Sequence, residues 1–129
     1  TRQAIPLAWT PDLPGGVSAI EVYPAGTLKA CGITRLPYKK KSQAQARRKI
    51  LERLAGFLPA IAQPALLESN ADVLDAAICV LAAADFLQGA VYQPDEAGGP
   101  GLPLAQNEGW IWARKPSPAQ RTLFPGNTD

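Results

Sequence analysis

The sequence predicts an α/β fold, because segments that alternate like strands are interleaved with segments that are spaced like helices. Apolar and polar residues alternate over residues 17–23 and again over residues 108–113, which predicts two strands. Apolar residues recur at helical spacing in residues 42–58 and 71–87, which predicts two helices. A chain of this pattern folds as a sheet with helices packed against it.

The first predicted strand runs directly into a short helix. Pro24 suits the first position of that helix, which covers roughly residues 25–31, and Gly32 suits its end. Glu21 therefore lies near the carboxyl end of a strand. Crevices beside such strand ends are where α/β folds usually place their sites.

The helix predicted over residues 42–58 begins with Ser42 and Gln45, which have the spacing of a capping box. Its buried stripe is formed by Ile50, Leu51, Leu54, Phe57 and Leu58. Its basic residues lie on the solvent side: Arg47, Arg48 and Lys49. Pro59 and Pro64 are expected to close this helix and open a loop.

The helix over residues 71–87 has Ser69 or Asn70 as its cap and Gly89 as its stop. It is apolar nearly all round, so we expect it to be buried on most sides. A short strand over residues 90–92 would follow it.

The composition is that of one globular domain. The chain has 129 residues, 47% hydrophobic and 19% charged, which is enough to bury a core. We expect one domain over residues 1–113 and a flexible tail over residues 114–129. No apolar run reaches the length of a membrane span and no signal-peptide pattern is seen, which favours a cytoplasmic protein with Cys31 and Cys79 as free thiols.

Two residue types, histidine and methionine, are absent from the chain, and each absence has a consequence. The chain has no histidine, which excludes Ser-His-Asp and Cys-His catalysis and histidine-ligated zinc within it. It has no methionine either, so we expect residue 1 to be internal to a longer protein or the product of processing.

Basic and acidic residues are segregated along the sequence. Residues 29–53 hold nine Lys and Arg and a single acid, whereas residues 55–113 hold seven acids and no Lys or Arg. Such a pattern suits a protein that grips phosphates with one surface and metal ions with another. Ordinary surface charge that happens to segregate is equally compatible with it.

Three acids stand out as candidates for chemistry. Asp72 and Asp75 share a helical face, and Asp75 has no cation three or four positions away within an apolar helix. A distant Lys or Arg could still pair with Asp75, Asp72 could simply complement the helix dipole, and Glu21 could lie on the wet face of an edge strand. If Glu21 and Asp75 face each other, they form an oxygen-ligand pair of the kind that Mg²⁺ or Mn²⁺ prefers.

Several short motifs occur in an order that is recognisable. They are Ile20-Glu21-Val22-Tyr23-Pro24-Ala25, Tyr38-Lys39, Asp72-Val73-Leu74-Asp75-Ala76 with Cys79 and Ala82, and Glu108-Gly109-Trp110-Ile111. Over residues 18–113 this resembles domain-of-unknown-function family 429, described as predicted ribonuclease-H-like nucleases. The Asp-x-x-Asp-Ala string also resembles the last acidic motif of Holliday-junction resolvases.

The resemblance implies a ribonuclease-H-like mixed sheet with flanking helices and a metal-dependent cleavage of phosphodiester bonds. Glu21, Asp72 and Asp75 would hold Mg²⁺ or Mn²⁺ and would be catalytic. Nucleic acid would be contacted by Tyr38, Lys39, Lys40, Arg47 and Arg48. The family's first acid lies on an N-terminal strand that has no counterpart before residue 17, so the chain would lack its N-terminal strands. Its sheet edge would then pair with that missing part or with another copy.

Two other readings of function stay open. One is a non-catalytic scaffold of the same fold that binds nucleic acid or a protein. The other, which we rank last, is a small-molecule phosphate-handling enzyme, because no Gly-rich phosphate loop is present. Trp110 and Trp112 could stack on bases, although their alternation with Ile111 favours packing in the core.

Overall fold

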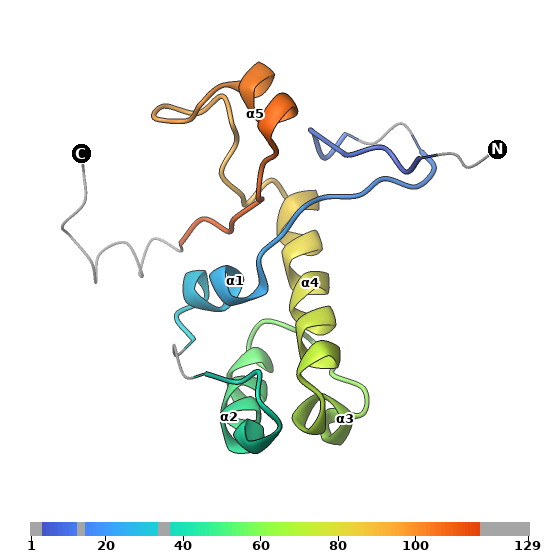
Figure 1. Ribbon diagram of the computed structural model, residues 1–129, viewed down its shortest axis with the longest axis vertical. Coiled ribbons are helices and arrows are strands. Elements are labelled where there is room, and N and C mark those ends of the chain that lie inside the picture. Colours follow the sequence, from blue (N-terminus) through green and yellow to red (C-terminus); the bar gives the residue numbers. More distant parts are fainter. Residues whose placement is uncertain (1–3, 13–14, 34–36, 117–129) are drawn as a thin grey trace.

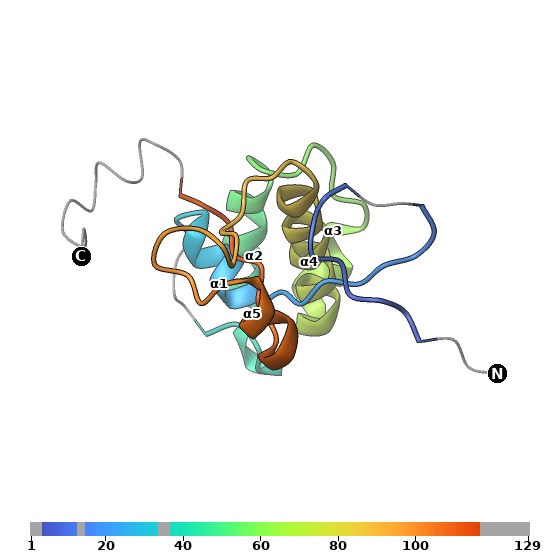
Figure 2. The same ribbon diagram turned by 90° about the horizontal axis from the view of Figure 1, so that it is seen from above.

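The computed structural model of the chain describes residues 4–12, 15–33 and 37–116. Within these ranges the chain is mainly helical (Figure 1). The elements in chain order are α1 (Pro24–Ala30), a 3-10 turn η1 (Lys41–Gln43), α2 (Ala44–Leu54), α3 (Pro64–Ser69), α4 (Ala71–Leu87) and α5 (Leu102–Glu108). In both views, α1 and α2 lie on the same side of the long helix α4 (Figures 1 and 2).

The predicted starts and stops of α1 and α4 are confirmed. Pro24 occupies the first turn of α1, and Gly32 follows its end with a φ of 72°. Asn70 caps α4, because its side-chain oxygen accepts hydrogen bonds from the backbone N–H groups of Asp72 and Val73. Gly89, also at a φ of 72°, ends that helix.

The predicted boundaries of the middle helix are wrong. The Gln43 side chain, rather than that of Gln45, reaches back to the backbone N–H of Lys40 at 2.9 Å, and α2 proper then runs only as far as Leu54. The segment expected to be a loop after Pro64 forms the short helix α3 instead. The short helix α5 was likewise not predicted, and it takes up Glu108, the first residue of the second expected strand.

The mixed sheet expected from the sequence is not formed among the described residues. The extended segments meet only at isolated bridges: Leu7 with Ala19 and Glu21 with Ile111 in parallel, and Val91 with Arg114 antiparallel. The alternation in residues 17–23 and 108–113 therefore marks extended chain that pairs one residue at a time. A strand becomes regular only when a neighbour pairs along its length, and the described part of the chain supplies no such neighbour.

The core is divided into two clusters that α4 joins. Leu74, Ile78 and Leu81 of α4 pack with residues of α1, α2 and α3 in the larger cluster. Phe86, near the other end of α4, packs with Trp112 in the smaller one. The helix thus acts as the common wall of both clusters, and α1 lies against its middle (Figure 1).

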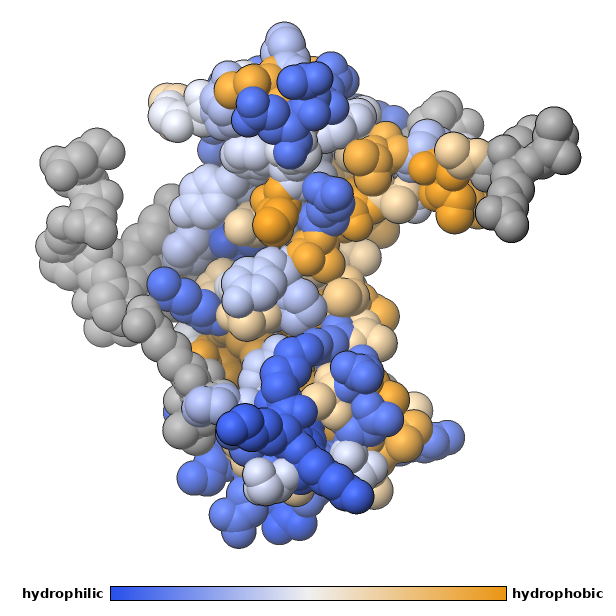
Figure 3. All heavy atoms as spheres, viewed as in Figure 1, coloured by the Kyte–Doolittle hydropathy of each residue, from blue (hydrophilic) through white to orange (hydrophobic). Residues whose placement is uncertain are grey.

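The expectation that α4 is buried on most sides holds except along one face. Its exposed residues are Asp72, Ala76, Val80 and Leu87, and the others are buried or half-buried. Val80 is 63% exposed and Leu87 is 58% exposed, because the described residues place no sheet against that side of the helix. Other large apolar side chains are also exposed, among them Ile5, Leu7 and Val17. In the space-filling view hydrophobic surface appears at the upper right, where Figure 1 places the N-terminal segment (Figure 3).

Two sequence expectations concern the chain as a whole. No helix of the described residues is long and apolar enough to cross a membrane. Of the expected tail, Arg114 and Lys115 are held by ion pairs to Asp85 and Glu96, and residues 117–129 lie outside the described part of the chain.

Candidate functional site

A cleft of about 510 Å³ opens between α1 and the segment that precedes α2. Asp75 of α4 forms part of its wall, and Leu28 and Ile33 are among the apolar residues that line it. Its described lining is Tyr23, Pro24, Ala25, Gly26, Leu28, Lys29, Ile33, Pro37, Tyr38, Lys39, Lys40, Gln43 and Asp75. Two sequence stretches and one helix therefore converge on it.

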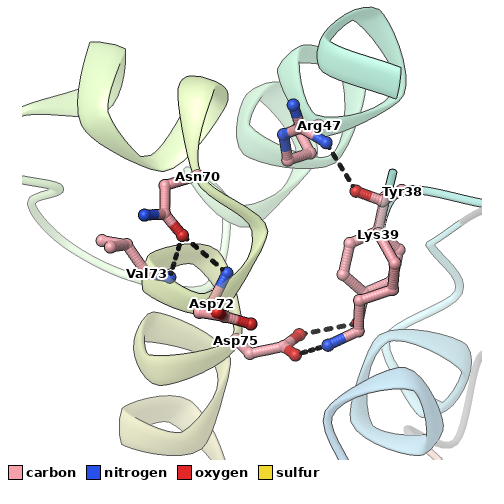
Figure 4. A network of polar contacts seen from close by, with 7 residues as sticks. All are labelled: Tyr38, Lys39, Arg47, Asn70, Asp72, Val73 and Asp75. Atoms are coloured by element: carbon pink, nitrogen blue, oxygen red, sulfur yellow. Dashed lines mark hydrogen bonds and ion pairs between the residues drawn. The ribbon is translucent and has the colours of Figure 1, made fainter. Parts of the chain in front are cut away.

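Asp75 is the centre of a polar network at this cleft (Figure 4). The buried Tyr38 hydroxyl donates a hydrogen bond to Asp75 Oδ1 at 2.8 Å, and the Lys39 ammonium forms an ion pair with Asp75 Oδ2. Burial raises the pKa of the Tyr38 phenol, and the nearby Tyr23 raises it further, so the hydroxyl stays protonated and donates. The sequence allowed a distant Lys or Arg to pair with Asp75, and in the structure that residue is Lys39.

Arg47 fixes the segment that carries Tyr38 and Lys39. Its side chain is 1% exposed, and its guanidinium donates to the main-chain carbonyls of Tyr38 and Lys40 at 2.7 Å and of Glu68 at 2.5 Å. Figure 4 shows it pointing at the Tyr38 carbonyl. The prediction that Arg47 lies on the solvent side is wrong, because these carbonyls need a buried donor and an arginine supplies several. It positions the cleft rim and has no surface to offer a phosphate.

The cleft has a surplus of positive charge. Lys29, Lys39 and Lys40 line it, and Asp75 is the one acid among its described lining residues. Lys39 is already paired with Asp75, whereas Lys29 and Lys40 form no ion pair within the described ranges. Both are exposed, so their ammonium groups are available to an anion that enters.

Arg48 lies outside this cleft. It is an exposed residue of α2 whose Nε and Nη2 both donate to Glu68 Oε1, at 3.1 and 2.8 Å. A guanidinium held by a neighbouring carboxylate has much of its charge compensated. Of the predicted nucleic-acid-binding residues, the structure thus brings Tyr38, Lys39 and Lys40 together at the cleft, with Arg47 buried behind them on their carbonyls. Arg48 lies apart from them.

The predicted metal ligands do not form one site. Glu21 is exposed, its carbonyl accepts from the N–H of Trp112 at 2.9 Å, and its carboxylate lies close to Gly109. Asp72 sits beside Asp75 in the first turns of α4 and is exposed (Figure 4). Among the described residues no group of three acids or cysteines is arranged to hold a metal ion.

The coordination chemistry of these acids also argues against a metal site formed by them alone. Mg²⁺ requires several oxygen ligands in near-octahedral positions. Both oxygens of Asp75 already have partners in Tyr38 and Lys39. The acids that the structure describes therefore do not fit a two-metal centre on their own.

The two tryptophans pack against each other and against α4. Trp112 is buried and meets Phe86 edge to face at 4.8 Å between ring centroids, and Trp110 meets Trp112 in the same way at 6.4 Å. The Trp110 indole N–H donates to the Tyr92 carbonyl at 3.2 Å. The core role that the sequence favoured for this pair is what the structure shows.

Sequence reasoning missed two residues of the cleft. The sequence places Tyr23 only at the end of the predicted strand and in the motif over residues 20–25, and Lys29 only in the basic run. The signal was the short helix between them: α1 begins directly after Tyr23 and carries Lys29 in its last turn. A helix of that length brings both its ends into one small region.

The site is a lysine-lined cleft on a small, mainly helical chain with an internally paired aspartate. A comparison with protein families matches residues 7–98 to the family described as "Protein of unknown function (DUF429)". The match covers well over half of the chain, and the chain belongs to this family. No curated protein and no solved structure shows a significant match.

Proposed function

We propose that this protein binds nucleic acid by its phosphate groups in the cleft beside Asp75. The observation that carries the proposal is the pair of exposed lysines, Lys29 and Lys40, that line the cleft without an ion-pair partner in the described structure. In nucleic acids the negative charge is carried by backbone phosphates, and lysines are among the residues that commonly bind them.

The arrangement around Asp75 supports this function. An acid at a phosphate-binding surface would repel its ligand, but Asp75 is already compensated by Lys39 and by the Tyr38 hydroxyl. Arg47 holds the main chain of this rim in place before any ligand arrives. A binding surface that is fixed in advance loses less conformational entropy when it takes up its ligand.

Cleavage of phosphodiester bonds with Mg²⁺ or Mn²⁺ is a second candidate. It is favoured by one observation, that the acid of the Asp-x-x-Asp-Ala string faces the phosphate-binding cleft. In this candidate residues 17–23 and the part of residues 108–113 that follows α5 belong to a ribonuclease-H-like sheet, and oxygen ligands additional to the described acids complete the metal site. If those oxygen ligands are absent, the protein is the non-catalytic scaffold, which has the same fold but binds no metal ion.

Binding can be tested by fluorescence anisotropy with a labelled oligonucleotide. Changing both Lys29 and Lys40 to Glu should weaken binding by roughly a hundredfold or more, because two phosphate contacts become two repulsions. Lys49→Glu is the matched control, since Lys49 is an exposed residue of α2 outside the cleft. Equal losses in the cleft variant and the control would contradict the proposed site.

Metal binding needs a separate measurement. Isothermal titration of Mn²⁺ into the protein and into Asp75→Asn asks whether this carboxylate is a ligand. Binding that disappears in the variant supports the cleavage candidate and calls for nuclease assays. If the protein takes up no Mn²⁺ at millimolar concentration, the cleavage candidate fails and the phosphate-binding function stands by itself.

A further inference from the structure

We infer that the cleft receives an unpaired nucleotide whose base stacks on Tyr23, so that the protein selects single-stranded over double-stranded nucleic acid. The inference rests on the proposed function and adds the form of the nucleic acid that binds. It is carried by the chemistry of the cleft lining, by its size and by the position of one aromatic ring.

The lining of the cleft divides into a charged rim and an apolar floor. The lysines supply the charge, while Pro24, Ala25 and Pro37 line the cleft with hydrocarbon that is at least partly exposed. Leu28 and Ile33, which also line it, belong to the buried core. A duplex lying across the rim would use the lysines alone, because its bases are covered by their stacked neighbours. Only a nucleotide that leaves the stack brings an apolar surface to meet the floor.

The size of the cleft agrees with such a guest. A volume of about 510 Å³ lies within the range of small-molecule sites and is ample for one nucleotide. A flat patch of lysines would suffice to bind a phosphate backbone, so the presence of a cleft favours a ligand that enters it.

Tyr23 is placed as a stacking surface. It lines the cleft, yet it is 59% exposed, unlike the buried Tyr38. Its ring lies against the first turn of α1, where a Cβ added to Gly26 would be 3.0 Å from Tyr23 Cδ1. The glycine thus lets the ring rest on the helix backbone and leaves the remainder of the ring open. A base that stacks on a tyrosine gains binding energy whatever its identity, because every base has a π-face.

The test compares one labelled oligonucleotide as a single strand and as a duplex, again by anisotropy. The single strand should bind more tightly, and Tyr23→Ala should weaken its binding roughly tenfold while leaving duplex binding nearly unchanged. Tyr23→Phe keeps a stacking ring and should retain the single-strand affinity.

Two further variants sharpen the comparison. Tyr92→Ala is the matched control, because Tyr92 is also a surface tyrosine but lies outside the cleft. It is 44% exposed, and the Lys115 ammonium lies 5.7 Å from its ring centroid. It should change neither affinity. Gly26→Ala is compatible with the helix but displaces the Tyr23 ring, so it should lower single-strand affinity without removing any charge.

A direct contact can be sought by irradiating the complex with a strand that contains iodouracil and mapping the crosslink by mass spectrometry. A crosslink to Tyr23 supports the inference. Equal affinity for single strand and duplex, or a Tyr23→Ala variant that binds like the parent, would overturn it while leaving phosphate binding intact. Binding of uridine monophosphate as tight as that of the strand would also overturn it. Absence of binding to either nucleic acid would overturn the proposed function itself.

Discussion

Arg47 is the residue whose role changes most between sequence and structure. In the sequence it belongs to a basic run and resembles its neighbour Arg48. In the structure its guanidinium is enclosed and bonded to main-chain carbonyls, whereas the Arg48 side chain is 63% exposed and pairs with Glu68. Adjacent positions on a helix differ in direction by about 100°, so two arginines in sequence can have unrelated surroundings.

This difference gives a prediction about stability. Arg47→Ala should lower the free energy of unfolding by about 3 kcal/mol or more, because several buried carbonyls lose their donor at once. Arg48→Ala should lower the free energy of unfolding far less, because an exposed ion pair contributes little. Urea denaturation of the two variants measures both values. Equal effects would show that the carbonyl contacts of Arg47 are not what holds this segment.

Asp75 shows how far residue-level reasoning reaches. An acid in an apolar helix without a local cation was correctly identified as needing a partner. The sequence could not distinguish a metal ion from Lys39, because Lys39 is 36 positions away and only the folding of the chain brings it near. The sequence left two positions open for Glu21 for a related reason: its place on an alternating segment says nothing about which segment lies beside it, and in the structure it is exposed.

At the scale of elements, α4 owes its start to a single side chain. The Asn70 side-chain oxygen accepts from the Asp72 and Val73 N–H groups at 2.9 and 3.3 Å. Ser69, the other cap that the sequence allowed, instead donates its hydroxyl to the Leu66 carbonyl of the preceding helix. Asn70 thus separates two consecutive helices with almost no connecting chain.

We predict that Asn70→Ala destabilises the protein by about 1 kcal/mol through loss of this cap. Ser69→Ala should cost less than half of that, because the first N–H groups of α4 keep their acceptor. Thermal unfolding followed by circular dichroism compares the two variants under one condition. A larger effect for Ser69→Ala would mean that the start of α4 is set from the side of α3.

The elements that the sequence predicted well are those with local signals at both ends. α1 has a proline at its start and a glycine after its end, and α4 has Asn70 and Gly89. Two elements were missed, α3 and α5, although both have a proline in the first turn and Gly109 follows α5. Prolines and glycines mark loops as well as helix ends, so in these stretches the same signals indicated loops. Regular strands were predicted from alternation alone, although a strand depends on partners that alternation does not specify.

At the scale of the molecule, Arg114 connects parts that are distant in sequence. Its guanidinium donates to Cys31 Sγ at 2.8 Å, lies 3.5 Å from Asp85 Oδ1 and sits over the Phe57 ring at 4.8 Å from the centroid. It therefore joins the end of α1, the last turn of α4 and the chain after α2. Asp85 is 3% exposed, and its Oδ2 has no hydrogen-bond partner among the described residues.

Asp85 should make the stability of the whole protein depend on pH. Burial raises the pKa of its carboxyl above the ordinary value, and Arg114 offsets part of that rise. An acid with a raised pKa in the folded state favours the folded protein while it is protonated. This contribution is lost as the pH rises from about 4, where the unfolded chain ionises, through the folded-state pKa.

The prediction is a difference between two stability profiles. Relative to Asp85→Asn, which cannot ionise, the parent protein should be most stable at acidic pH and should lose that advantage towards neutral pH. Asp12→Asn, a change at an exposed acid, should leave the profile as it is. Urea denaturation across this pH range provides the profiles. An advantage of the parent that grows with pH would mean that the ion pair with Arg114 outweighs the cost of burial.

The contacts of Arg47 have a consequence for how this cleft can diversify. They end on backbone carbonyls of residues 38, 40 and 41, and every amino acid has a carbonyl. The exposed side chains at positions 40 and 41 can therefore be exchanged without breaking the contacts of Arg47, whereas the buried Tyr38 is also held by Asp75. The shape of the rim and its chemistry can therefore change independently. Arg47 maintains the backbone of the rim, while substitutions at the exposed positions can alter which ligands the cleft binds.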